Sequence, residues 1–189
     1  MAIVTNLDVL AEWAKENICS KVLLKAPDDD ANDENYAFKL VHPEAFTLYV
    51  PSKDVSLTYP TPSICVQLLG GADKQNRGSM DVRFCFAVWN PGQHLDDLVN
   101  GETTEKDYFK LNNDGWRDLW NFIDVALSVV ESTETIKTMR IVKEKDIEYG
   151  LFKDNNGVIL DYFPYWHGWV RFSVEYGIIR NRKQVDEFL

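Results

Sequence analysis

The chain has 189 residues, a formal net charge of −10, and 20 Lys and Arg against 30 Asp and Glu. A hydrophobic share of 45% excludes disorder over most of the length, and the lack of a basic run argues against binding to nucleic-acid phosphates. No segment reaches the ~18 apolar residues of a membrane span, and the N-terminus lacks a signal-peptide pattern. We therefore expect one domain, residues 1–189, that has no membrane partner and is made in the cytoplasm.

Two helices are predicted from apolar residues at helical spacing. The first covers residues 6–19, with Thr5 or Asn6 as its cap, because either side-chain oxygen can accept a free backbone N–H. The second follows a predicted cap at Asp114 and covers 115–132. Its predicted apolar stripe is formed by Trp116, Leu119, Trp120, Ile123, Leu127 and Val130.

The remaining elements are predicted strands. Short strands are expected at 21–25, on both sides of Pro43, at 141–142 and at 147–152. Asn-Asn-Gly at 155–157 predicts a turn. Strict alternation places Met80, Val82, Phe84, Phe86 and Val88 on one face of a strand, and Val170, Phe172, Val174 and Tyr176 on one face of another. Two helices on a mainly antiparallel sheet define an α+β fold.

Three stretches are expected to make contacts with other subunits. The loop from Gly70 to Ser79 joins two strands; its three glycines permit tight turning, which predicts a projecting tip. Residues 90–113 form a long polar excursion with a short helix expected around 104–110. An aromatic strip at 162–169 leads into the last strand. The candidate interface residues are Asp73, Lys74, Asn76, Arg77, Asp96, Asp97, Tyr162, Phe163, Tyr165 and Trp166.

The cysteines and the acidic loop give no firm metal or redox site. Cys19, Cys65 and Cys85 have no CxxC spacing and are expected to be reduced, although a bridge between Cys65 and Cys85 stays open. The stretch from Asp28 to Glu34 resembles the opening of a calcium loop but lacks the glycine of its sharp turn. A solvated loop fits it better, and a calcium-binding module remains an alternative.

The histidines are isolated in the sequence. His42 precedes a proline and fits a turn, His94 beside Asp96 and Asp97 fits a solvated loop better than a metal cluster, and His167 has no acidic residue near it in sequence. A general base needs a partner that orients it. We therefore predict no catalytic residue, no metal and no cofactor, with a small hydrolase as the less favoured alternative.

Four phrases of the sequence carry a family resemblance: TPSICVQL, VRFCFAVWNPG, GWRDLWNFID and GWVRFSVEYG. Together with the order of the elements they resemble tail terminator (tail completion) proteins of long-tailed phages, prophages and tail-derived bacteriocins, from about Leu7 to Ile179. The resemblance implies a structural α+β protein that forms a homo-hexameric ring on the head-proximal end of the tail tube. It also implies a role in the assembled particle rather than in catalysis.

The implied partners are the tail tube protein, a neck, connector or collar protein and, in a contractile tail, the sheath protein. The ring would stop tube growth and offer a docking surface for the neck. DNA would pass through as cargo without specific binding, and an acidic lumen would keep it from adhering. Another neck or connector subunit of the same particle is the nearest alternative.

Overall fold

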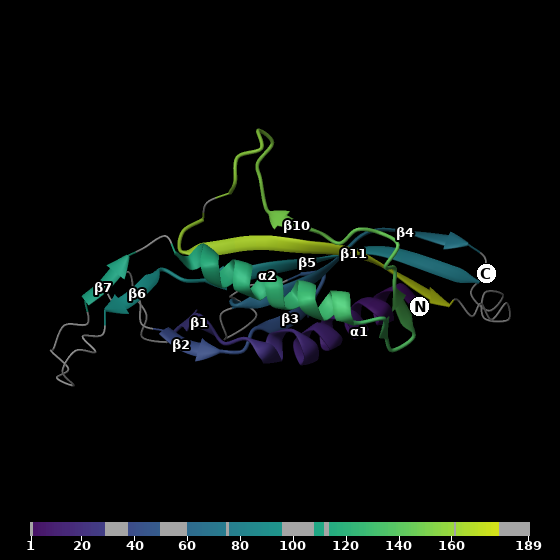
Figure 1. Ribbon diagram of the computed structural model, residues 1–189, viewed down its shortest axis with the longest axis horizontal. Helices are drawn as coiled ribbons and strands as arrows, with labels where there is room; N and C mark the ends of the chain where they lie inside the picture. The colour runs from purple at the N-terminus through teal and green to yellow at the C-terminus, as the bar shows by residue number, and fades with distance from the viewer. Residues whose placement is uncertain are drawn as a thin grey trace, which may run out of the picture.

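The computed structural model describes residues 2–28, 38–49, 60–74, 76–95, 108–111, 114–160 and 162–177. Within these ranges the fold is α+β, as predicted: two α-helices cover one face of a mostly antiparallel sheet (Figure 1). Helix α1 spans Ala2–Asn17 and is followed by a 3-10 turn, Cys19–Lys21. Helix α2 spans Gly115–Ser132.

Three long antiparallel strands form the centre of the main sheet: β4 (Ser63–Lys74), β5 (Arg77–Trp89) and β11 (Tyr165–Gly177). The strand order is β3-β4-β5-β11-β9-β8, and β10 also pairs with β11. The shorter strands are β3 (Glu44–Thr47), which is parallel to β4, β8 (Thr135–Ile136), β9 (Met139–Ile141) and β10 (Glu148–Leu151). Strands β5 and β11 have 13 residues each. At about 3.3 Å per residue they extend about 43 Å, so the sheet is elongated.

Two small antiparallel sheets lie at one end of the molecule, on the left in Figure 1. One pairs β1 (Leu24–Pro27) with β2 (Phe38–Val41), and the other pairs β6 (Gly92–Leu95) with β7 (Tyr108–Leu111). Pro43 lies between β2 and β3, as the sequence predicted.

The alternation of the two long strands is confirmed by burial. The five apolar residues of β5, from Met80 to Val88, are at most 1% exposed, and their neighbours point to the opposite face. Phe84 packs edge-on against Phe172 of β11, with ring centroids 5.0 Å apart, and Phe86 packs edge-on against Phe122 of α2 at 4.9 Å. These aromatic pairs join the sheet to α2 and fix how the helix lies on it.

The helix predictions are right in position and wrong in detail. Helix α1 begins at Ala2, so Thr5 and Asn6 lie inside it and are not caps. Asp114 does precede α2, but its carboxylate lies 3.5 Å from Arg117 Nε and makes no capping hydrogen bond. Leu119, Ile123 and Val130 of the predicted stripe of α2 are buried, as predicted. The buried face also includes Phe122, Ala126 and Val129, which the prediction omitted, whereas Trp116 is 39% exposed. Packing against Phe86 rotates the helix away from the stripe that its tryptophans suggested.

The predicted hairpin loop is largely strand, which corrects its expected length. Strand β4 continues to Lys74 and β5 starts at Arg77, with a bulge between Leu68 and Gly70. A Cβ on Gly71 would lie 2.7 Å from the carbonyl oxygen of Ser79 on the facing strand. This glycine therefore permits a close approach of two strands rather than a turn.

Three smaller predictions also need correction. The helix expected around 104–110 is wrong where it can be checked, because Tyr108–Leu111 is strand β7; residues 104–107 lie outside the described ranges. The strand expected at 21–25 begins at Leu24. Tyr165 and Trp166 belong to β11 itself and do not precede it.

Candidate assembly surfaces

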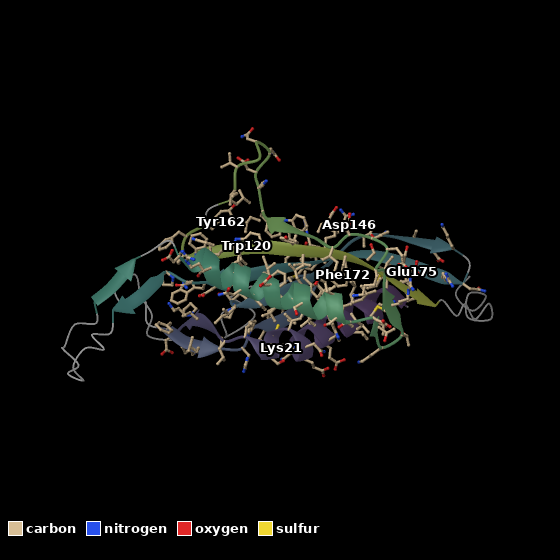
Figure 2. The ribbon with its side chains drawn as sticks, in the orientation of Figure 1. Lys21, Trp120, Asp146, Tyr162, Phe172 and Glu175 are labelled. Carbon is tan, nitrogen blue, oxygen red and sulfur yellow. The ribbon has the colours of Figure 1, made fainter. Side chains whose placement is uncertain are left out.

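The structure places the predicted contact residues at opposite ends of the long sheet. Strands β5 and β11 pair from Arg77 with Gly177 at one end to Trp89 with Tyr165 at the other. Figure 2 shows the same separation, with Glu175 and Tyr162 toward the two ends. The four candidates of the hairpin tip, Asp73, Lys74, Asn76 and Arg77, are all exposed. Asp96 and Asp97 lie outside the described residues.

The aromatic strip divides into anchors and exposed side chains. Trp166 is half-buried and its indole N–H donates to the carbonyl oxygen of Asn90 at 3.1 Å. Tyr165 is also half-buried. Tyr162 and Phe163 are 57% and 37% exposed, and their rings meet those of His167 and Trp166 edge-on.

Asn90, directly after β5, is the centre of a polar network at this end. Its side-chain oxygen accepts from the N–H of Gly92 at 2.9 Å and from Lys25 Nζ at 3.4 Å, and its amide donates to the carboxylate of Asp118 at 2.6 Å. Lys25 also donates to the Gly92 carbonyl. Burial lowers the pKa of Lys25, and the nearby Asp118 charge opposes that shift.

This network joins three distant parts of the chain, namely β1, α2 and the start of β6. Sequence reasoning missed it because its members are far apart in sequence and share no spacing pattern. The bonds from Lys25 and Asn90 tie Gly92 at the start of β6 to β1 and to the end of β5. The donors and acceptors of the buried Asn90 side chain are thereby satisfied, as a buried amide requires.

A narrow hairpin between β10 and β11 projects from the body (Figure 1). We call residues 152–160 the apolar finger. Its two sides are held by hydrogen bonds from Leu160 N to Phe152 O (3.0 Å) and from Asp154 N to Val158 O (2.8 Å). The Asp154 carboxylate accepts from the N–H groups of Asn156 and Val158, both at 2.8 Å. Gly157 at φ 82° completes the predicted turn.

Apolar side chains are exposed on and around this finger. Val158 and Ile159 near its tip are 62% and 53% exposed, and Tyr149 on β10 is 54% exposed. Tyr162 and Phe163, which precede β11, are exposed as well. The sequence predicts the turn at 155–157, but no sequence pattern indicates that Val158 and Ile159 after it are exposed.

The sheet face away from the helices carries two connected ion pairs. The Asp81 carboxylate accepts from the Ser173 hydroxyl and from Lys145 Nζ (3.1 Å), and these bonds lower the pKa of Asp81, with the serine bond the larger cause. Arg171 pairs with Glu148 at 3.1 Å. Exposed carboxylates on the outer sides of the helices are those of Asp8, Glu12, Glu16, Asp124 and Glu131, of which Glu12 pairs with Lys137 at 2.7 Å.

The cysteines are free thiols in unreactive surroundings. Cys65 and Cys85 lie directly opposite each other on β4 and β5, yet they are not bridged. Cys85 donates to the side-chain oxygen of Gln67 at 3.2 Å. Burial raises the pKa of Cys65 to about 11 and also raises that of Cys85, which disfavours the nucleophilic thiolate.

The two histidines with described side chains, His42 and His167, contact other groups of the fold. His42 Nδ1 lies 2.7 Å from the carbonyl oxygen of Val22, so this nitrogen carries the proton and donates. The His167 ring meets that of Tyr162 edge-on, and burial lowers the pKa of His167. The side chain of His94 lies outside the described part.

The calcium alternative falls mainly on residues that are not described. Asp28 can be placed, with its carboxylate 3.6 Å from Lys39 Nζ, whereas residues 29–34 lie outside the described ranges. Among the described residues, no group of three or more His, Cys, Asp or Glu side chains is arranged to hold a metal ion. In the same part of the chain, no helix has the length and apolar character needed to cross a membrane.

Comparison with known proteins adds no assignment. No family model matches the sequence, and no curated protein shows significant similarity to it. The resemblance to tail terminator proteins therefore remains a prediction from the residues quoted above.

Proposed function

We propose that the protein is a structural subunit that assembles with copies of itself into a ring and caps the head-proximal end of a phage or phage-like tail tube. In this role it ends tube polymerisation and provides the surface on which a neck or collar protein, and in a contractile tail the sheath, docks. The family resemblance supports the assignment to a phage tail or tail-like particle. The geometry of the chain supports self-assembly.

The observation that carries the proposal is the exposure of large apolar side chains on the apolar finger and on the chain to either side of it. The exposed fractions of these side chains lie between 37% and 62% for Val158 and Ile159 on the finger, Tyr149 on β10, and Tyr162 and Phe163 before β11. Exposed large apolar side chains on and beside a projecting hairpin favour a protein-protein contact. At about 25 cal/mol per Å² of apolar surface, covering it favours association.

The separation of the surfaces also favours a ring. A head-to-tail contact needs two different surfaces on each subunit, and it closes into a ring when the rotation between copies permits. The hairpin tip lies at one end of the 13-residue strands and the finger, aromatic residues and β6–β7 arm lie toward the other. The exposed carboxylates along both helices are consistent with a particle that carries DNA without binding it.

Electron microscopy of tube ends tests the function. The purified chain is mixed with tubes polymerised from the tail tube protein of the same particle, and the tube ends are imaged. We expect a ring on one end of each tube and no further growth from that end. Tubes that keep growing, with bare ends at a molar excess of this chain, would rule out the terminator role.

A further inference from the structure

The turn at the tip of the projecting apolar finger contains an Asn-Gly pair that the proposed function does not use (Figure 1). The turn consists of residues 154–157, in which Asn156 immediately precedes Gly157, and both are exposed to solvent. Of the asparagines in the described ranges, Asn156 alone is followed by a glycine; the exposed Asn76 and Asn121 precede residues with bulky side chains. The pair is therefore chemically distinct from the other described asparagines.

We propose that Asn156 is a site of spontaneous deamidation through a cyclic intermediate. After losing its proton to water, the backbone nitrogen of Gly157 attacks the side-chain carbonyl carbon of Asn156. The new carbon–nitrogen bond closes a succinimide ring, and the bond from that carbon to the amide nitrogen breaks, which releases ammonia. Water then opens the ring at either carbonyl and yields aspartate or isoaspartate. The net reaction consumes water and needs no enzyme, oxidant or reductant.

Two features of the turn favour this reaction at Asn156. Glycine has no Cβ, so no side chain shields the attacking nitrogen or restricts the rotation that brings it to the amide. The Asn156 side chain is exposed, and its amide makes no hydrogen bond with the described residues. Asn155, one position earlier in the same turn, is followed by a residue with a side chain and lacks the first feature.

The hydrogen bonds of the turn oppose the reaction and set its rate. The Gly157 N–H donates to the carbonyl oxygen of Asp154 at 3.0 Å, which holds the attacking nitrogen within the turn. The Asp154 carboxylate accepts from the N–H groups of Asn156 and Val158, both at 2.8 Å. An intramolecular attack needs its reacting atoms aligned, so these bonds must open first. Because the turn is exposed, they slow the reaction without closing the route.

The product changes the turn itself. A carboxylate at position 156 lies two residues from that of Asp154, so like charges repel each other within the turn. The isoaspartyl form also adds a carbon to the main chain, which shifts the N–H groups that the Asp154 carboxylate holds. Deamidation therefore weakens the hydrogen bonds that close the finger.

Peptide mapping of the full chain tests the site. The native protein is incubated in mildly alkaline buffer beside a sample unfolded in guanidinium chloride, and tryptic peptides are sequenced by mass spectrometry. The peptide 154–171 follows Lys153 and contains both asparagines of the turn. We expect conversion of Asn156 to both aspartate and isoaspartate, with Asn155 as the unmodified internal control. Conversion in the native chain should be about tenfold slower than in the unfolded chain.

Variants of Asp154 separate the effect of the turn from that of the sequence. Asp154→Ala removes the acceptor of two hydrogen bonds and should raise the native rate about fivefold. Asp154→Asn keeps an acceptor oxygen and should react at nearly the wild-type rate. In guanidinium chloride, where the turn is absent, all three proteins should react equally.

Three results would overturn the proposed site. The first is an intact Asn156 in the native chain after about ten times the period that converts the unfolded chain. The second is modification of Asn155 at the same rate, and the third is aspartate without isoaspartate, which indicates direct attack by water on the amide. Equal native rates for Asp154→Ala and wild type would refute the positioning role of Asp154.

Discussion

Replacement of Asn90 by alanine should destabilise the protein by about 3 kcal/mol. The substitution removes a neutral hydrogen bond to Gly92 N–H, worth about 1 kcal/mol, and a bond to the Asp118 carboxylate, worth about 2 kcal/mol. The contact with Lys25 at 3.4 Å adds little. For a chain of this size, about 3 kcal/mol lowers the melting temperature by about 6 to 12 °C.

Urea denaturation measures this loss as a lower midpoint with an unchanged slope. Asn121→Ala on the exposed side of α2 is the matched control and should change stability by less than about 0.5 kcal/mol. A double-mutant cycle of Asn90→Ala with Asp118→Ala should give a coupling of at least about 1 kcal/mol. Additive effects of the two substitutions, or a cost for Asn90→Ala no larger than the control, would refute the role given to this network.

Three further outcomes follow from the same packing and burial. Gly71→Ala should lower the free energy of unfolding, measured by chemical denaturation, by about 1 to 3 kcal/mol because the added Cβ would meet a backbone oxygen of the facing strand. The added Cβ of Gly70→Ala meets nothing within 4 Å, so this control should be nearly neutral. Equal losses of stability for the two variants would contradict the close approach at Gly71. Burial lowers the pKa of His167. The contribution of the neutral ring to folding stability is therefore fully present above the unfolded pKa of about 6.5 and is lost as pH falls through the folded pKa. His167→Gln should flatten the fall in melting temperature below about pH 6.5, and an unchanged slope would count against this role. Burial raises the pKa of Cys19 to about 12 and of Cys65 to about 11, so Ellman's reagent at pH 8 should label these thiols quickly in denaturant and slowly in the native protein, and fast native labelling would show that they are accessible.

The sequence predicted the parts of the fold that depend on periodicity. The buried face of β5 and that of β11 follow from strict alternation, and both helices follow from helical spacing. The start of α1 and the rotation of α2 could not be predicted, because the first depends on where helical hydrogen bonding begins and the second on Phe122 meeting Phe86. Glycines suggested a turn at Gly71, where the structure uses the missing side chain for close strand approach.

In the candidate surfaces too, local sequence patterns predict some features, whereas others depend on tertiary contacts. Aromatic residues at 162–166 were identified from composition alone, but their split into the anchor Trp166 and the exposed Tyr162 depends on a hydrogen bond to a residue 76 positions away. The apolar finger was missed because Val158 and Ile159 have the composition of a core strand. Their exposure results from the projection of the hairpin, which no local pattern encodes.

The most direct measurement of the central claim is imaging of the purified full chain by electron microscopy, alone and with tail tubes. The account predicts closed rings of identical subunits that join head to tail and sit on one end of each tube. Isolated single subunits under both conditions, at concentrations where tubes are stable, would contradict it.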